Sequence, residues 1–140
     1  MYRPKNPKFF IRALSICSIF FLFSSTYIYA QPKVINLCSN VFDEFAPSLS
    51  ADGKTLVFQS NRDGEYKIYQ SFLQENGLWS DPLPILSVNN FGKRTDLVAG
   101  PSISYDGNTL YFCASYDDGY GDLDIYYAKR EGNGWGKPIN

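Results

Sequence analysis

Four aspartates in one short stretch are the residues of this chain that could bind a metal ion. Asp117, Asp118, Asp122 and Asp124 lie in the sequence DDGYGDLD. Carboxylate oxygens suit Ca²⁺, but a calcium loop needs about six or more oxygens at a defined spacing. The stretch lacks the alternating Asp/Asn ladder and the distant Glu of an EF-hand. We therefore expect an acidic, glycine-rich turn and no cofactor, with weak Ca²⁺ binding as the alternative.

The chain offers little support for nucleophilic or acid–base catalysis. It contains no histidine, the commonest general base and metal ligand. No G-x-S-x-G motif is present to mark a nucleophilic serine. Cys38 and Cys113 are the cysteines outside the N-terminal segment, and the sequence leaves open whether they pair. We predict no catalytic residue in this chain.

An internal repeat organises the rest of the sequence. The segment APSLSADGKTLVFQS, which begins at Ala46, recurs 54 positions later from Gly100 as GPSISYDGNTLYFCA. The echo continues in residues 67–69 (KIY) and 124–126 (DIY), and a tryptophan follows in each copy. A period near fifty residues is typical of propeller arrays, in which each repeat forms one blade.

Each copy of the repeat predicts a short antiparallel sheet of four strands. In both copies an Asp-Gly pair marks a tight turn, because glycine tolerates the positive φ that such turns need. Alternation in the strand after this turn places Leu56, Phe58 and Ser60 on one face and Thr55, Val57 and Gln59 on the other. The predicted strands cover 45–50, 55–60, 66–73 and about 83–88 in the first copy, and include 109–114 and 123–129 in the second.

The predicted fold is therefore all-β: a partial β-propeller of two four-stranded antiparallel blades, at about residues 43–88 and 97–140, after an N-terminal signal segment. The full division is a signal peptide (1–30), an N-terminal strand and loop (31–42), the first blade (43–88), a linker (89–98) and an incomplete second blade (99–140). Residues 33–36 (KVIN) echo 137–140 (KPIN), which makes the early strand a candidate for the outer strand of a closing blade.

The string P-S-x-S-x-D-G-x-T-L-x-F, followed by an aspartate-rich turn and K-I-Y or D-I-Y, resembles the TolB-type, WD-repeat-like propeller repeat. The resemblance covers residues 33–140. It implies a bacterial envelope propeller that binds other proteins or gates a peptidase domain, and it implies no reaction of its own. The positions that carry it are Pro47, Ser50, Asp52, Gly53, Phe58, Ile68 and Tyr69, and in the second copy Pro101, Ser104, Asp106, Gly107, Phe112, Ile125 and Tyr126.

Structural roles explain these repeat positions. We expect Asp52 and Asp106 to bond the backbone of their turns, as aspartate commonly does. The large apolar members are expected to fill the space between adjacent blades; they are Phe58, Phe112, Ile68 and Ile125.

A glycan-cleaving alternative comes from the stretch 50–56 (SADGKTL), which is superficially similar to the Asp-box of sialidase propellers. Its spacing departs from that motif, since Asp and Gly are adjacent and Leu replaces Trp. Arg62, Arg94 and Arg130 could supply an arginine triad for a carboxylate. They occupy non-equivalent places in the repeat, so we expect three separate, solvated arginines.

The N-terminal segment reads as an export signal. Basic residues open it, and residues 13–23 (ALSICSIFFLF) form an uncharged run that is short for a membrane span. We expect cleavage after Ala30, with an uncleaved membrane anchor as the alternative. The large residue before Cys17 argues against lipidation there. The predicted location is the periplasm or cell envelope.

The predicted function is that of an exported scaffold or binding module for a protein or peptidoglycan-associated partner. Tyr66, Tyr116 and Tyr120 are candidates for a binding rim, because tyrosine supplies large, partly polar contact area. All acidic residues lie after position 30, which disfavours nucleic acid as a partner. The alternative is the accessory propeller of an envelope peptidase or glycosidase whose catalytic residues lie elsewhere. Two blades cannot close a propeller, so we expect this sequence to be an N-terminal piece of a larger protein that supplies further blades, with assembly of several copies into a ring as the alternative.

Overall fold

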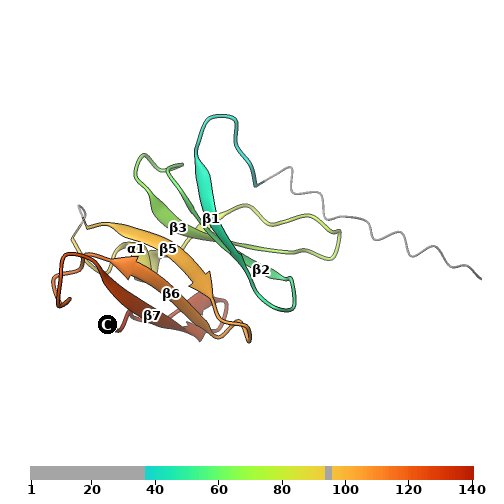
Figure 1. The fold of residues 1–140 in the computed structure, drawn as a ribbon. Coiled ribbons are helices and arrows are strands. Elements are labelled where there is room, and N and C mark those ends of the chain that lie inside the picture. Colours follow the sequence, from blue (N-terminus) through green and yellow to red (C-terminus); the bar gives the residue numbers. More distant parts are fainter. Residues whose placement is uncertain (1–36, 94–95) are drawn as a thin grey trace, which may run out of the picture. The chain divides into compact units, whose positions relative to one another are not determined.

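The chain forms two four-stranded antiparallel sheets in a computed structural model that describes residues 37–93 and 96–140. Each sheet is a meander in which every strand pairs with its neighbours along the chain (Figure 1). The first contains β1 (Glu44–Leu49), β2 (Thr55–Ser60), β3 (Lys67–Phe72) and β4 (Leu83–Pro84). The second contains β5 (Val98–Ile103), β6 (Thr109–Ala114), β7 (Asp124–Glu131) and β8 (Gly134–Trp135). The predicted β class and the two four-stranded sheets are confirmed.

The predicted signal peptide lies outside the described residues, and so does most of the predicted N-terminal strand. Within the described part of the chain, no helix is long and apolar enough to cross a membrane.

The two Asp-Gly turns have the same hydrogen bonds. Asp52 accepts a bond from the Ser50 hydroxyl at 2.6 Å and another from the backbone N–H of Lys54 at 3.0 Å. Asp106 repeats both contacts with Ser104 and Asn108 at 2.6 and 3.0 Å. The glycine that follows each aspartate has a positive φ of 69° or 71°. The predicted role of both aspartates in bonding the turn backbone is confirmed.

A β-bulge interrupts the first strand of each sheet. The pairing register shifts between Phe45 and Ser48 in β1, and at the equivalent place in β5. The residue at the bulge has a left-handed backbone in both sheets: Gly100 with φ 61° and Ala46 with φ 51°. Glycine adopts this conformation freely, whereas alanine is strained in it.

The fourth strand of the first sheet is shorter than predicted. It ends at Pro84, and the helical turn α1 (Leu86–Asn89) follows where the sequence predicted strand up to residue 88. The Asn89 side chain accepts from the Ile68 N–H at 3.0 Å and donates to the Ile68 carbonyl at 2.8 Å. Because this amide satisfies both backbone groups of Ile68, the chain need not stay extended beside β3. The turn also buries Val88 completely.

Each sheet has two chemically distinct faces. We call the face that bears Phe58 or Phe112 the Phe face, and the face that bears Ile68 or Ile125 the Ile face. The register supports this division, since Phe58 pairs with Tyr69 and Phe112 with Tyr126 across neighbouring strands. The predicted alternation along β2 is therefore confirmed.

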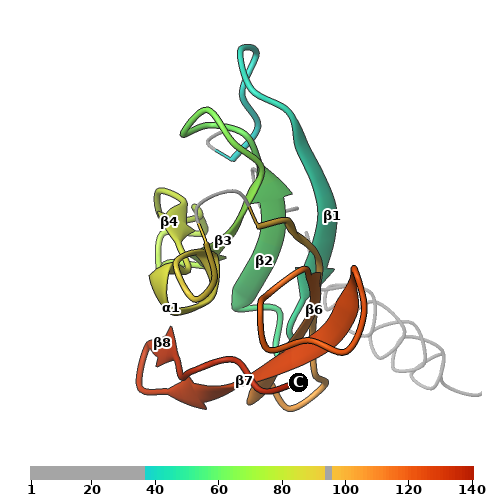
Figure 2. The same ribbon diagram turned by 90° about the vertical axis from the view of Figure 1, so that its left-hand side faces the viewer.

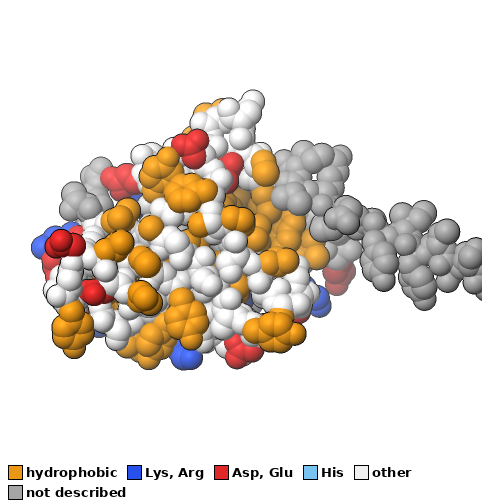
Figure 3. Space-filling model, in the orientation of Figure 1, with side chains coloured by type: hydrophobic (Ala, Val, Ile, Leu, Met, Phe, Trp, Pro, Cys, Tyr) orange, Lys and Arg blue, Asp and Glu red, His pale blue; other side chains and the backbone are white. Residues whose placement is uncertain are grey.

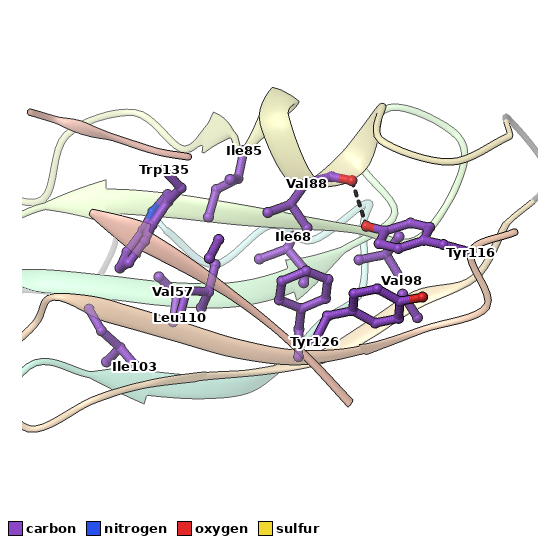
Figure 4. Packing of buried hydrophobic residues seen from close by; sticks show 13 residues of the cluster. Val57, Ile68, Ile85, Val88, Val98, Ile103, Leu110, Tyr116, Tyr126 and Trp135 are labelled. Carbon is purple, nitrogen blue, oxygen red and sulfur yellow. Dashed lines mark hydrogen bonds between the residues drawn. The ribbon is translucent and has the colours of Figure 1, made fainter. Parts of the chain in front are cut away.

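The main core lies between the Ile face of the first sheet and the Phe face of the second (Figure 4). Val57 and Ile68 from the first sheet are fully buried there. The helical turn α1 adds Val88, and it lies beside β8 at one edge of the two sheets (Figure 2). The second sheet supplies the larger part of the core: Val98, Ile103, Leu110, Phe112, Ala114, Tyr116, Tyr126, Ala128 and Trp135.

The other two faces have no neighbouring sheet among the described residues. On the Phe face of the first sheet, Phe58 and Tyr69 form a smaller cluster with Leu37 and Trp79. On the Ile face of the second sheet, Ile125 is 71% exposed. Ile125 therefore does not lie between the two described sheets, and its place between blades stays a prediction. Ile68 and Phe112 are confirmed between the sheets, whereas Phe58 is buried on the outer face.

Candidate functional site

Two buried glutamines on the Ile face of the first sheet hold the second sheet in place. Gln59 donates to the Val98 carbonyl at 3.1 Å and accepts from the Gly100 N–H at 3.2 Å. Gln70 donates to the Asn133 carbonyl at 3.2 Å and accepts from the indole N–H of Trp135 at 2.9 Å. Sequence reasoning missed these roles, because the second copy of the repeat has Cys113 and Tyr127 at the equivalent positions.

Two further hydrogen bonds connect the sheets near the Asp-Gly turns. Ser48 accepts a hydrogen bond from the Ile103 N–H at 3.0 Å through its hydroxyl oxygen. The Ala51 N–H donates to the Tyr105 carbonyl at 3.3 Å. Together with the glutamines, these bonds fix how the second sheet is placed on the first.

The predicted tyrosine rim is only partly at the surface. Tyr120 is 94% exposed and Tyr66 is 44% exposed. Tyr66 donates to an Asp43 carboxylate oxygen at 2.9 Å and packs edge-on against Phe45, with ring centroids 5.3 Å apart. The bond to Asp43 raises the pKa of Tyr66 above its ordinary value.

Tyr116 does not belong to that rim. It is only 4% exposed, and its hydroxyl donates to the Val88 carbonyl at 2.7 Å (Figure 4). Its ring packs against Phe112 and Tyr126, with centroids 6.3 and 4.8 Å away. Burial raises the pKa of Tyr116. The prediction of an exposed Tyr116 is therefore wrong, because the second sheet turns this position toward the core.

Arg62 stands at the position of Tyr116 in the first copy of the repeat. Its guanidinium carbon lies 5.3 Å from the Phe58 ring centre and 5.1 Å from that of Tyr69. It pairs with Glu44 at 3.1 Å and donates to the Leu37 carbonyl at 3.5 Å. A cation therefore covers the Phe face of the first sheet in the way that a tyrosine covers the Phe face of the second.

The two described members of the predicted arginine triad, Arg62 and Arg130, do not share a site. Arg130 lies over the Trp135 ring at 4.3 Å and donates to Thr55 at 3.3 Å, so its partners are separate from those of Arg62. Burial lowers the pKa of Arg130. Arg94 lies outside the described residues.

The acidic turn uses its carboxylates for local structure. Asp124 accepts hydrogen bonds from the N–H groups of Tyr120 and Gly121, at 2.6 and 2.9 Å. Asp118 accepts from the Tyr126 hydroxyl at 2.9 Å, as Asp63 does from Tyr69 at 2.7 Å in the first copy.

The other potential metal ligands lie apart. Asp117 pairs with Lys93 at 2.7 Å at the surface. Asp122 is exposed, and Cys38 and Cys113 are free thiols. Within residues 37–93 and 96–140, no group of three or more Cys, Asp or Glu is placed to hold a metal ion. Weak Ca²⁺ binding at the acidic turn stays a prediction.

The outer Phe face of the first sheet contains an apolar hollow of about 240 Å³. Glu44 is the charged residue in its lining, and Arg62 neutralises it. The remaining lining residues are Leu37, Cys38, Phe45, Pro47, Leu56 and Phe58.

The outer Ile face of the second sheet is the other candidate contact surface. Tyr111 and Tyr127 lie side by side on it, with ring centroids 6.4 Å apart, and the Lys129 ammonium lies 5.5 Å from the Tyr127 ring centre. Exposed apolar and aromatic surfaces of this kind are common where proteins contact one another.

No protein-family model matches this chain, and no curated protein is found to match it. Functional assignment therefore depends on the repeat and on the surfaces described above.

Proposed function

We propose that the two sheets are adjacent blades of a β-propeller and that the protein is an exported scaffold that binds a protein partner or the cell wall. The observation that carries this proposal is the stacking of the Phe face of one sheet on the Ile face of the other. The two copies of the repeat share strand order, bulge and turn bonds, so each sheet repeats the same unit. Radial repetition of four-stranded sheets is the architecture of propellers.

A binding role is supported by the chemistry at one end of the sheets. Tyr66 lies in the β2–β3 turn and Tyr120 in the equivalent β6–β7 turn, so the meander brings both to the same rim. Both side chains are exposed, and tyrosine is enriched in protein interfaces. Export is supported by the basic and apolar N-terminal segment.

Site-specific photocrosslinking in cells tests the binding role. A crosslinking amino acid at Tyr120 is expected to give a discrete adduct in the envelope fraction. The control position is Glu75, which is also exposed but lies in the β3–β4 turn at the opposite rim. Equal adducts from both positions, or none from Tyr120, would contradict a binding rim.

The intact mass of the protein from its native source tests export separately. We expect the N-terminus at Gln31 and the protein in the envelope fraction. A cytosolic protein that keeps residues 1–30 would contradict export. A catalytic domain found on the same polypeptide would instead favour the hydrolase alternative.

A further inference from the structure

We propose that this protein binds a second copy of itself head to tail, with the Ile face of the second sheet of one copy packed on the Phe face of the first sheet of the next. This inference rests on the proposed stacking of blades, and it depends neither on export nor on the tyrosine rim. We infer that the partner is a second copy, because one chain carries both an open Ile face and an open Phe face.

The interface between the chain's own two sheets is the template. Val57 and Ile68 on the Ile face are fully buried against the Phe face of the second sheet. Their equivalents on the second sheet are Tyr111 and Ile125, which are 46% and 71% exposed. The Ile face of the first sheet is thus covered by the second sheet, whereas the Ile face of the second sheet is open.

The open Ile face is apolar and aromatic in character. Figure 3 shows hydrophobic side chains gathered over the region that the second sheet occupies in Figure 1. An exposed apolar patch of this kind marks a surface that contacts another protein.

The Phe face of the first sheet has uncovered apolar surface that an Ile face could cover. Leu49 on β1 is 52% exposed, whereas its equivalent Ile103 on β5 is 7% exposed because the first sheet lies against it. The apolar hollow beside Phe58 and Leu56 belongs to the same face. A docking Ile face would therefore cover both Leu49 and the hollow.

Polar groups at the two open faces match in the same way. In the template, Ser48 accepts the Ile103 N–H across the interface at 3.0 Å. Ser102 is the equivalent of Ser48 and is exposed, and Leu49 is the equivalent of Ile103. A second copy in the template arrangement would bring the Leu49 N–H of one chain to the Ser102 hydroxyl of the other.

The proposed contact between two copies differs in one respect from the contact between the two sheets of one chain. The second sheet lacks the two glutamines that bond across the sheets of one chain. Cys113 and Tyr127 replace Gln59 and Gln70, so the docking face has a thiol and a phenol in place of two amides. Tyr127 lies beside Tyr111, which replaces Val57. We expect this contact to depend on apolar burial more than on hydrogen bonds. It should accordingly persist in high salt.

A head-to-tail contact closes into a ring when the rotation between copies permits it. Propellers close with about four to eight blades, so two to four copies would complete one if each chain supplies the two described sheets. The expected assembly has a discrete mass of about two to four chains and presents the rims of all blades together.

Sedimentation velocity of the purified protein over a concentration series tests the proposal. Ile125→Asp on the Ile face and Leu49→Asp on the Phe face should each weaken self-association at least about 100-fold, because docking would bury an unpaired carboxylate. Each variant keeps one intact face, so mixing the two should give a heterodimer that does not grow further. Leu86→Asp, at an exposed leucine of α1 outside both open faces, is the matched control and should assemble like the unaltered protein.

Three results would overturn the proposal. The unaltered protein could remain monomeric at every concentration, either single variant could still associate alone, or the mixture of variants could stay monomeric. Association of Leu49→Asp alone would indicate an Ile-face dimer, and association of Ile125→Asp alone would indicate a Phe-face dimer. Circular dichroism verifies that each variant is folded. Crosslinking at Tyr120 and the export test are read independently, so their failure would leave this result standing.

Discussion

Trp135 donates its indole N–H to the Oε1 atom of Gln70 at 2.9 Å, and this buried bond joins the last strand of the second sheet to the third strand of the first. The two residues are 65 positions apart in sequence. The same glutamine also holds the Asn133 carbonyl at 3.2 Å. One amide thus fixes the outer part of the second sheet against the first.

Gln70→Leu should destabilise the protein by about 1–3 kcal/mol, because it leaves the buried Trp135 N–H without a partner. Urea unfolding followed by tryptophan fluorescence measures the change. The double variant Gln70→Leu, Trp135→Phe should lose less than the sum of the two single changes, because both polar partners are then gone. Gln74→Leu, at an exposed turn, is the control. If the losses of stability in the two single variants were additive, Gln70 and Trp135 would not be energetically coupled.

Tyr116→Phe should lower the free energy of unfolding by about 0.5–1.5 kcal/mol. The change removes the bond to the Val88 carbonyl and keeps the ring that packs against Phe112 and Tyr126. Tyr120→Phe should leave stability unchanged, since Tyr120 is exposed. Equal effects of the two variants in thermal unfolding would contradict a structural role for the Tyr116 hydroxyl.

Ala46→Gly should stabilise the protein by about 0.5–1 kcal/mol. Ala46 has a φ of 51°, and glycine relieves the strain of a left-handed backbone at the cost of greater freedom in the unfolded chain. Gly100→Ala makes the opposite change at the equivalent bulge of the second sheet, where φ is 61°, and should destabilise. Chemical unfolding of both variants measures the two effects. A loss of stability in Ala46→Gly would show that the methyl group contributes packing that outweighs the strain.

The pKa values of Asp52 and Asp106 should lie below their ordinary value of 3.8, chiefly because of hydrogen bonds from Ser50 and Ser104. A carboxylate whose pKa is lowered by folding stabilises the native state above pH 3.8, and this contribution is lost as pH falls through the lower folded-state value. Ser50→Ala should move the pKa of Asp52 back toward the ordinary value and leave Asp106 unchanged. Carboxyl NMR titration measures both groups. An unchanged pKa of Asp52 in Ser50→Ala would contradict the assigned cause.

Local features of the fold could be predicted from the sequence because they depend on neighbouring residues. The Asp-Gly turns are set by a serine, an aspartate and a glycine within a few positions, and the structure has them as predicted. The alternation in β2 likewise follows from the two-residue period of a strand. The end of the strand predicted over residues 83–88 is instead a helical turn. In this turn the Asn89 side chain bonds the backbone of Ile68, a residue far from it in the sequence.

The candidate surfaces depended on tertiary structure. Ile68 and Ile125 are the same residue at equivalent positions of the repeat, so no local pattern separates them. One is fully buried and the other 71% exposed, because a second sheet covers only the first of these faces. Arg62 and Tyr116 likewise share a position but meet different neighbours, which decides that Tyr116 is a core residue. Sequence alone determined the repeat, its turns and the two faces of each sheet; burial is a property of what packs against a face, and only the tertiary arrangement decided that.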